Sequence, residues 1–161
     1  MGLLARLNTL GPKETWPALH NAADERYWDG LELATCRQAR HLGAIYLLGY
    51  VAEIVLKVAF FRVLGWPSKQ SVDLKALKTH ASWGRSNLHD VEELAKVLIA
   101  ERANRKKAFN PVFAAQLQLH AKCLSTNWRE TLRYNHSSAS YAELAEVFQS
   151  VEWLRLNFDL L

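Results

Sequence analysis

The sequence predicts an all-α fold, an antiparallel bundle of four long helices with shorter helical pieces. Three observations support this fold class: one almost entirely apolar stretch, several segments with apolar residues at helical spacing, and no run with the alternation typical of strands. The chain has 161 residues, the size of one ordinary domain, and half of them are hydrophobic. We therefore expect a single domain over residues 1–161, with residues 1–21 as an N-terminal arm and residues 66–87 as a loop carrying at most a short helix.

The apolar stretch, residues 41–65, is the predicted central helix. Between Gly43 and Phe61 its only formal charges are Glu53 and Lys57. A helix that is apolar on nearly every side is either buried or membrane-spanning. Two charges near its middle argue against a span, since each costs roughly 2.5–3.5 kcal/mol at mid-bilayer. We expect a core helix in a cytoplasmic protein that contacts no membrane, in which Glu53 and Lys57 pair across one turn. A nucleotide or small-ligand site beside this pair is a weaker alternative.

Helical periodicity and end signals predict the elements around this helix. Residues 22–37 have a helical apolar face, and Pro12 and Pro17 interrupt any longer helix before it. Gly65 and Pro67 end the central helix. Asp90 is the predicted N-cap of a helix to about residue 103, with Glu93 at capping-box spacing.

Two further helices complete the predicted bundle. Asn110 and Pro111 start one that extends to about residue 128 or 132, and residues 141–158 form the last. We expect Tyr141 to be a core aromatic residue. The tryptophans are expected in the core or at an interface, and they include Trp66, Trp83, Trp128 and Trp153.

Composition excludes some classes of site. Cys36 and Cys123 are too few and too far apart for a disulfide framework or a metal site, so we expect both to be reduced and partly buried. The histidines have no metal-ligand spacing, and we expect neither metal nor cofactor. The net charge of +4 permits nucleic-acid contact without requiring it.

One basic cluster stands out: Arg102, Arg105, Lys106 and Lys107. Cations are favourable at the C-terminal end of a helix, where they complement its dipole, so a solvated helix end explains the cluster. The alternative is a phosphate-facing patch that binds RNA. The sequence leaves both interpretations open.

Three stretches carry a family resemblance when taken together. They read GYVAE at residues 49–53, LHDVEEL at residues 88–94 and WRETLRY at residues 128–134, the last followed by a polar break and a final helix. Their order and spacing resemble the HEPN family (higher eukaryotes and prokaryotes nucleotide-binding) over residues 22–158. The resemblance implies a HEPN-like bundle that forms a homodimer. It also implies RNA, or a partner protein such as an antitoxin or a nucleotidyltransferase, as a binding partner.

The same resemblance implies a candidate catalytic site. Many HEPN proteins are metal-independent ribonucleases in which an arginine is followed, after four to six residues, by a histidine. Arg129 and His136 match with six residues between them. His136 would act as general acid or base, and Arg129 or Arg133 would hold the scissile phosphate.

One residue departs from that pattern. Glu130 stands where the catalytic members commonly have a small polar residue. Members that have lost catalysis serve as binding modules. We therefore expect a non-catalytic dimerisation or binding module in a toxin–antitoxin or defence context, with the metal-independent ribonuclease as the alternative.

Overall fold

The computed structural model describes residues 15–37, 39–72, 89–129, 131–132 and 138–161. These residues contain no strand beyond an isolated bridge between Thr15 and Ser71. The all-α prediction is confirmed, with five helices in the described residues rather than four long ones. They are α2 (Trp16–Thr35), α3 (His41–Leu64), α5 (Val91–Asn104), α6 (Pro111–Asn127) and α7 (Tyr141–Leu156).

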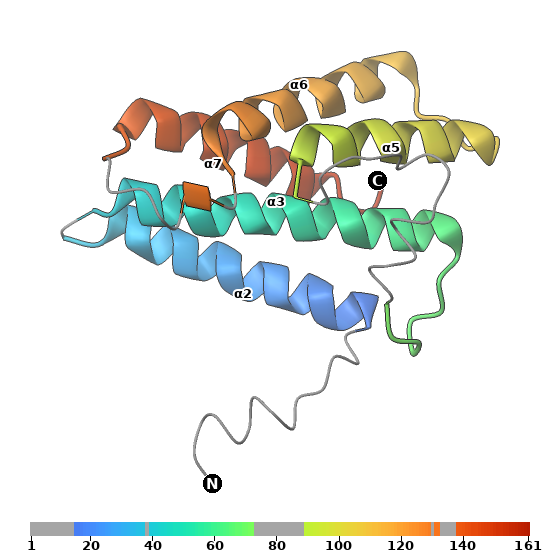
Figure 1. The fold of residues 1–161 in the computed structure, drawn as a ribbon, viewed down its shortest axis with the longest axis horizontal. Helices are drawn as coiled ribbons and strands as arrows, with labels where there is room; N and C mark the ends of the chain where they lie inside the picture. The colour runs from blue at the N-terminus through green and yellow to red at the C-terminus, as the bar shows by residue number, and fades with distance from the viewer. Residues whose placement is uncertain (1–14, 38, 73–88, 130, 133–137) are drawn as a thin grey trace, which may run out of the picture.

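Helix α3 is the centre of the bundle. Figure 1 shows α2 along one side of α3 and helices α5, α6 and α7 on the other. Its buried residues include both of its central charges, Glu53 and Lys57. Among the described residues α3 is the one helix long and apolar enough to cross a membrane, but most of it is covered by protein, as in the core helix of a soluble protein.

The predicted end of α3 is confirmed. Gly65 has φ 73°, in the left-handed region that glycine adopts without strain, and its N–H donates to carbonyls of the last turn. The Nε1–H of Trp66 donates to the Ser71 carbonyl, 3.2 Å away. The Nε1–H of Trp16 donates to the Trp66 carbonyl at 3.0 Å, which ties the start of α2 to the end of α3.

Helix α2 begins six residues earlier than expected, so residues 16–21 are helix rather than arm. Pro17 lies in the first turn, where a missing N–H costs no intrahelical hydrogen bond. Thr15 caps this turn by accepting from the N–H of Ala18. The prediction failed because proline interrupts a helix interior but is well tolerated at its start.

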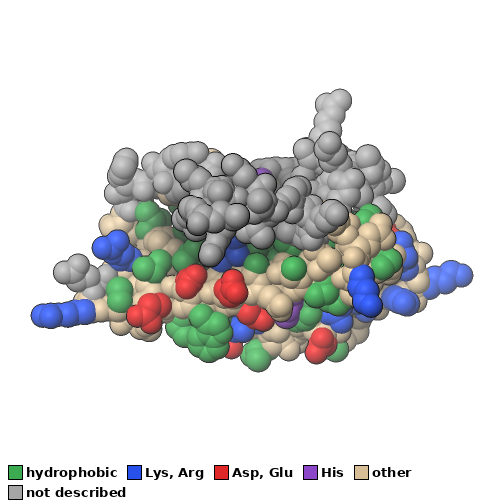
Figure 2. Space-filling view, turned by 90° about the horizontal axis from the view of Figure 1, so that it is seen from below, with side chains coloured by type: hydrophobic (Ala, Val, Ile, Leu, Met, Phe, Trp, Pro, Cys, Tyr) green, Lys and Arg blue, Asp and Glu red, His purple; other side chains and the backbone are tan. Residues whose placement is uncertain are grey.

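The outer face of α2 is acidic. Glu25, Asp29 and Glu32 are exposed there, beside the exposed Trp28. Figure 2 shows acidic and hydrophobic side chains gathered on this side of the molecule. A polyanion such as RNA would be repelled by the acidic side chains of this face.

The remaining helices start at side-chain caps. Asp90, Asn110 and Ser140 each accept from backbone N–H groups in the first turn that follows them. Helix α6 ends at Asn127, because Trp128 has an extended backbone, so the longer of the two predicted ends is not observed. The apolar faces predicted for all three helices point into the core.

Candidate functional site

Arg129 is the described member of the predicted catalytic set. It lies on the surface directly after Trp128, which caps the C-terminal end of α6. Glu130, Arg133 and His136 lie outside the described residues. The meeting of Arg129 with His136 therefore stays a prediction.

Trp128 fixes the point from which Arg129 extends. The Trp128 side chain is only 2% exposed, and its Nε1–H donates to the Tyr46 carbonyl at 3.0 Å. Its ring packs against Gly49 so closely that a Cβ added there would lie 2.1 Å from the indole. Glycine at position 49 is thus what allows the tryptophan to dock on α3, and the backbone entering residue 129 is held by that contact.

The other end of the candidate segment also returns to α3. The Nδ1–H of His41 donates to the carbonyl of Ala139 at 3.2 Å. Arg40, His41 and Ser138 line a hollow of about 180 Å³. Sequence reasoning gave His41 no role, because nothing local to it signals a contact with residue 139.

Tyr141, expected in the core, is 74% exposed. It lies in the first turn of α7, and its ring meets His41 edge-on with 6.1 Å between ring centroids. The first turn of a helix projects beyond the packed part of its inner face. Helical spacing alone therefore misplaced this residue.

Two members of the basic cluster are held within the chain. Arg102 donates through Nε to the Lys107 carbonyl at 3.0 Å and through a terminal nitrogen to the Leu161 carbonyl at 2.7 Å. Burial, and after it the positive charge of Arg62, lowers the pKa of Arg102. The Nε–H of Arg105 donates to Glu101, 2.5 Å away.

Lys106 and Lys107 are exposed, and Lys106 has a left-handed φ of 58° just after α5. Their ammonium groups make no hydrogen bond or ion pair in the described part of the chain. Of the four cations predicted as an RNA-facing patch, only these two lysines present uncommitted charge. This is the arrangement of a helix C-terminal end at which Arg102 and Arg105 form hydrogen bonds with groups of the same chain.

A second cluster of charged groups lies inside the bundle. The predicted pair is present, with Lys57 Nζ 2.5 Å from Glu53 Oε1. The Nδ1–H of His89 donates to the other carboxylate oxygen at 3.0 Å. The lysine and glutamate side chains are 8% and 6% exposed. Sequence reasoning treated His89 as part of a helix start and missed this contact, which joins residues 36 positions apart.

A pocket of about 460 Å³ opens beside this cluster, between α2 and α3. Its polar lining consists of Arg26, Tyr46, Tyr50, Glu53 and Lys57, and its apolar lining consists of Leu19, Ala22, Leu47 and Ile54. The hydroxyl of Tyr46 donates to that of Tyr50 at 3.3 Å. The pocket therefore combines apolar walls with converging charges, which is the usual make-up of a small-molecule site.

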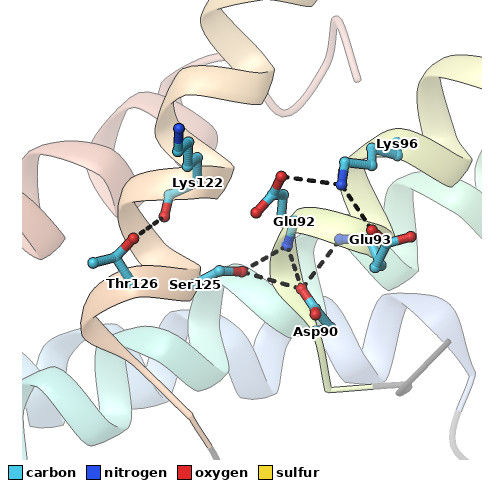
Figure 3. A network of polar contacts seen from close by, with 7 residues as sticks. All are labelled: Asp90, Glu92, Glu93, Lys96, Lys122, Ser125 and Thr126. Atoms are coloured by element: carbon cyan, nitrogen blue, oxygen red, sulfur yellow. Dashed lines mark hydrogen bonds and ion pairs between the residues drawn. The ribbon is translucent and has the colours of Figure 1, made fainter.

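The junction of α5 with α6 carries a polar network, drawn in Figure 3. Asp90 Oδ1 accepts from the N–H groups of Glu92 and Glu93 and from the Ser125 hydroxyl. The carboxylate of Glu93, expected to complete a capping box, pairs with Lys96 instead, at 2.7 Å. Hydrogen bonds to Glu93 and Glu92 raise the pKa of Lys96.

Beside this network lies a shallow groove of about 350 Å³ on the outer surface of α5 and α6. The groove is lined by Glu92, Lys96, Ala115, Gln118, Leu119 and Lys122. Leu119 is 66% exposed there, and Val112, two turns earlier on α6, is 71% exposed. The groove and these two residues together are called the α5–α6 face below.

Within the described ranges, no three histidine, cysteine, aspartate or glutamate side chains are grouped as metal ligands. Cys36 and Cys123 have intermediate exposure, in agreement with the expected partial burial. Comparison of the chain with protein-family models, curated proteins and solved structures finds no match.

Proposed function

We propose that the chain is a HEPN-like helical module that acts by binding, first of all to a second copy of itself, in a toxin–antitoxin or other defence context. The observation that carries this proposal is the α5–α6 face. It has an apolar centre formed by Val112, Ala115 and Leu119 on one side of α6, with charged residues around it. Protein interfaces have this arrangement of an apolar core inside a polar rim.

The charges of the face suit self-association. Glu92 lies on α5, and Lys122 lies on α6 with an ammonium group that has no ion-pair partner among the described residues. A two-fold axis running along the groove between α5 and α6 would bring Lys122 of each copy toward Glu92 of the other, where Glu92 also pairs with Lys96 of its own chain at 3.0 Å. Both signs of charge are then matched across the axis, which favours a second copy of this chain as the occupant.

Light scattering after size-exclusion chromatography tests the pairing. We expect a dimer for the unaltered chain and a monomer for Leu119→Glu, because the substitution places a carboxylate in the apolar centre of the face. Leu156→Glu is the matched control, since Leu156 is also an exposed leucine, at 78% against 66% for Leu119, but is the last residue of α7. A Leu119→Glu variant that stays dimeric, or a monomeric unaltered chain at high micromolar concentration, rejects the proposed interface.

The alternative is a metal-independent ribonuclease built on Arg129 and His136. The observation that favours it is the exposed Arg129 on a backbone fixed by Trp128. In such a reaction the 2′-hydroxyl of the RNA attacks the adjacent phosphate, the histidine moves the proton, and the arginine stabilises the developing negative charge.

The ribonuclease is tested by RNA cleavage in the presence of a chelator. Activity that is lost in both Arg129→Ala and His136→Ala, and kept in Arg37→Ala, supports catalysis at this site. Arg37 is the control because it is an exposed arginine in the turn that follows α2 and is not part of the predicted catalytic set. Cleavage that survives in both variants assigns the activity elsewhere or to a contaminant.

A further inference from the structure

The pocket between α2 and α3 contains a cation that no acidic side chain of the described residues neutralises. Arg26 projects from α2, and one of its terminal nitrogens donates to the Ala22 carbonyl at 3.0 Å, one turn back along its own helix. This contact holds the guanidinium over the pocket lining. No carboxylate in the described part of the chain forms an ion pair with it.

Lys57 contributes a second cation from α3. An ammonium group has three hydrogens to donate, and the described residues supply one acceptor, Glu53 Oε1. Buried donors usually have partners, so two remaining hydrogens on a lysine that is more than nine-tenths buried point to a further acceptor in the pocket.

The charges around the pocket do not cancel. Among the side chains that line the pocket, Arg26 and Lys57 carry one positive charge each and Glu53 carries one negative charge, which leaves +1. Both oxygens of Glu53 are already bonded, one to Lys57 and one to His89. An incoming group therefore meets two cations and a carboxylate that is already engaged.

The apolar and aromatic walls of the pocket indicate what the uncharged part of a bound ligand would be. Leu19 and Ile54 face the pocket from opposite helices, and Tyr46 and Tyr50 add aromatic surface. We propose that this pocket binds a small amphipathic monoanion, an organic carboxylate whose acid group lies between Arg26 and Lys57 and whose aliphatic or aromatic body packs on these walls. Charge-assisted hydrogen bonds to the acid supply orientation, and burial of the body supplies affinity.

The proposal is tested by titration calorimetry on the full chain with octanoate and phenylacetate. Octylammonium and octan-1-ol serve as probes that keep the apolar body and change the head group. We expect one site for at least one of the two acids, and binding weaker by about tenfold or more for the alcohol and the amine. Absence of binding by both acids at millimolar concentration, or equal affinity for octanoate and octylammonium, overturns the proposal.

Two variants locate the site. Arg26→Gln is expected to weaken acid binding by about tenfold, since it removes one charge-assisted contact while leaving a side chain of similar length. Arg37→Gln removes the same charge outside the pocket and is expected to leave the affinity unchanged. Equal affinities for these two variants would show that the acid binds elsewhere.

A third variant probes the walls without changing charge. Ala22→Leu fills part of the pocket and should abolish binding, whereas Ala142→Leu, on the exposed first turn of α7, should not. Circular dichroism of each variant confirms that the fold is kept. Binding of the acid does not require self-association, so a chain that is monomeric in solution is expected to bind it as well.

Discussion

At the scale of single residues, Gly49 has the least freedom to change. It lies in the middle of α3, where alanine would ordinarily favour the helix by up to about 1 kcal/mol. The Trp128 ring occupies the space that a side chain would need. Packing therefore outweighs helix propensity at this position.

We predict that Gly49→Ala lowers the free energy of unfolding by about 1–3 kcal/mol, the usual cost of overpacking a core. Gly43→Ala is the control, since its Cβ would meet the flexible end of Leu33 at 3.3 Å and the Cβ of Arg40 at an ordinary contact distance of 3.9 Å. Urea denaturation of both variants measures the difference. A Gly49→Ala variant as stable as the unaltered chain would mean that Trp128 does not dock as described.

The side chain of His120 makes the stability of the fold depend on pH. It stacks on Trp153 with 4.7 Å between ring centroids, and its Nδ1 lies 3.2 Å from the Ser150 hydroxyl. Burial lowers the pKa of His120 from its usual 6.5. The folded chain therefore resists a proton that the unfolded chain accepts, and stability is lost as the pH falls below about 6.5.

We predict that the unaltered chain loses more thermal stability than His120→Gln between pH 7.5 and pH 5.5. Comparing the two chains isolates His120 from the other histidines. Differential scanning calorimetry at the two pH values gives both midpoints. An identical loss in the two chains would contradict a role for this side chain.

At the scale of helices, the start of α5 depends on a contact with α6. Asp90 caps α5, and Ser125 both donates to Asp90 at 3.2 Å and accepts from the N–H of Glu92 at 2.9 Å. A cap of this kind has two effects at once, since it stabilises the first turn of α5 and docks that turn on α6 (Figure 3).

We predict that Asp90→Ala costs about 1–2 kcal/mol of stability, with Ser125→Ala costing less. The two residues share hydrogen bonds, so the double variant should lose less than the sum, with a coupling on the order of 0.5 kcal/mol or more. Chemical denaturation of the unaltered chain, the two single variants and the double variant gives the four free energies of unfolding that the double-mutant cycle needs. Strict additivity would show that the capping bond and the docking bond are independent.

The same scale shows what could be predicted from the sequence. The end of α3 and the starts of α5 and α6 were predicted correctly because Gly65, Asp90 and Asn110 act within one turn of themselves. The start of α2 was missed because Pro17 permits a first turn as readily as it ends a helix.

Contacts between segments that are far apart in the sequence could not be predicted from local sequence patterns. Docking of Trp128 on Gly49 and of His89 on Glu53 depends on how helices cross, and no local pattern encodes the crossing. Of the candidate site, the sequence predicted the Glu53–Lys57 pair because both residues lie on one helix, four residues apart. It did not predict that α2 would place Arg26 beside them.

At the scale of the whole molecule, the buried charges of Glu53 and Lys57 on α3 are compatible with the core only as a pair. Removing one member leaves the other buried with fewer partners, whereas removing both leaves apolar side chains in an apolar core. We predict that Lys57→Met costs about 3 kcal/mol or more, and that Lys57→Met combined with Glu53→Leu costs less than the single change. Thermal denaturation of the single and the double variant shows which of the two is less stable. A double variant less stable than the single one would mean that the Glu53 carboxylate stabilises the fold chiefly through His89.

The position of α2 has a consequence for how the molecule opens. Helix α2 rests chiefly on α3, whereas α3 is covered on both sides (Figure 1). Its described links to α7 are the ion pair of Asp24 with Arg155 at 3.1 Å, the stacking of Arg155 and Phe148 on Tyr27, and a hydrogen bond between the Tyr27 and Glu152 side chains. A helix attached in this way can detach as a unit while the other four stay folded. Backbone amides of α2 should then exchange with deuterium sooner than those of α3, and an acid bound in the pocket, which needs both helices, should delay that exchange.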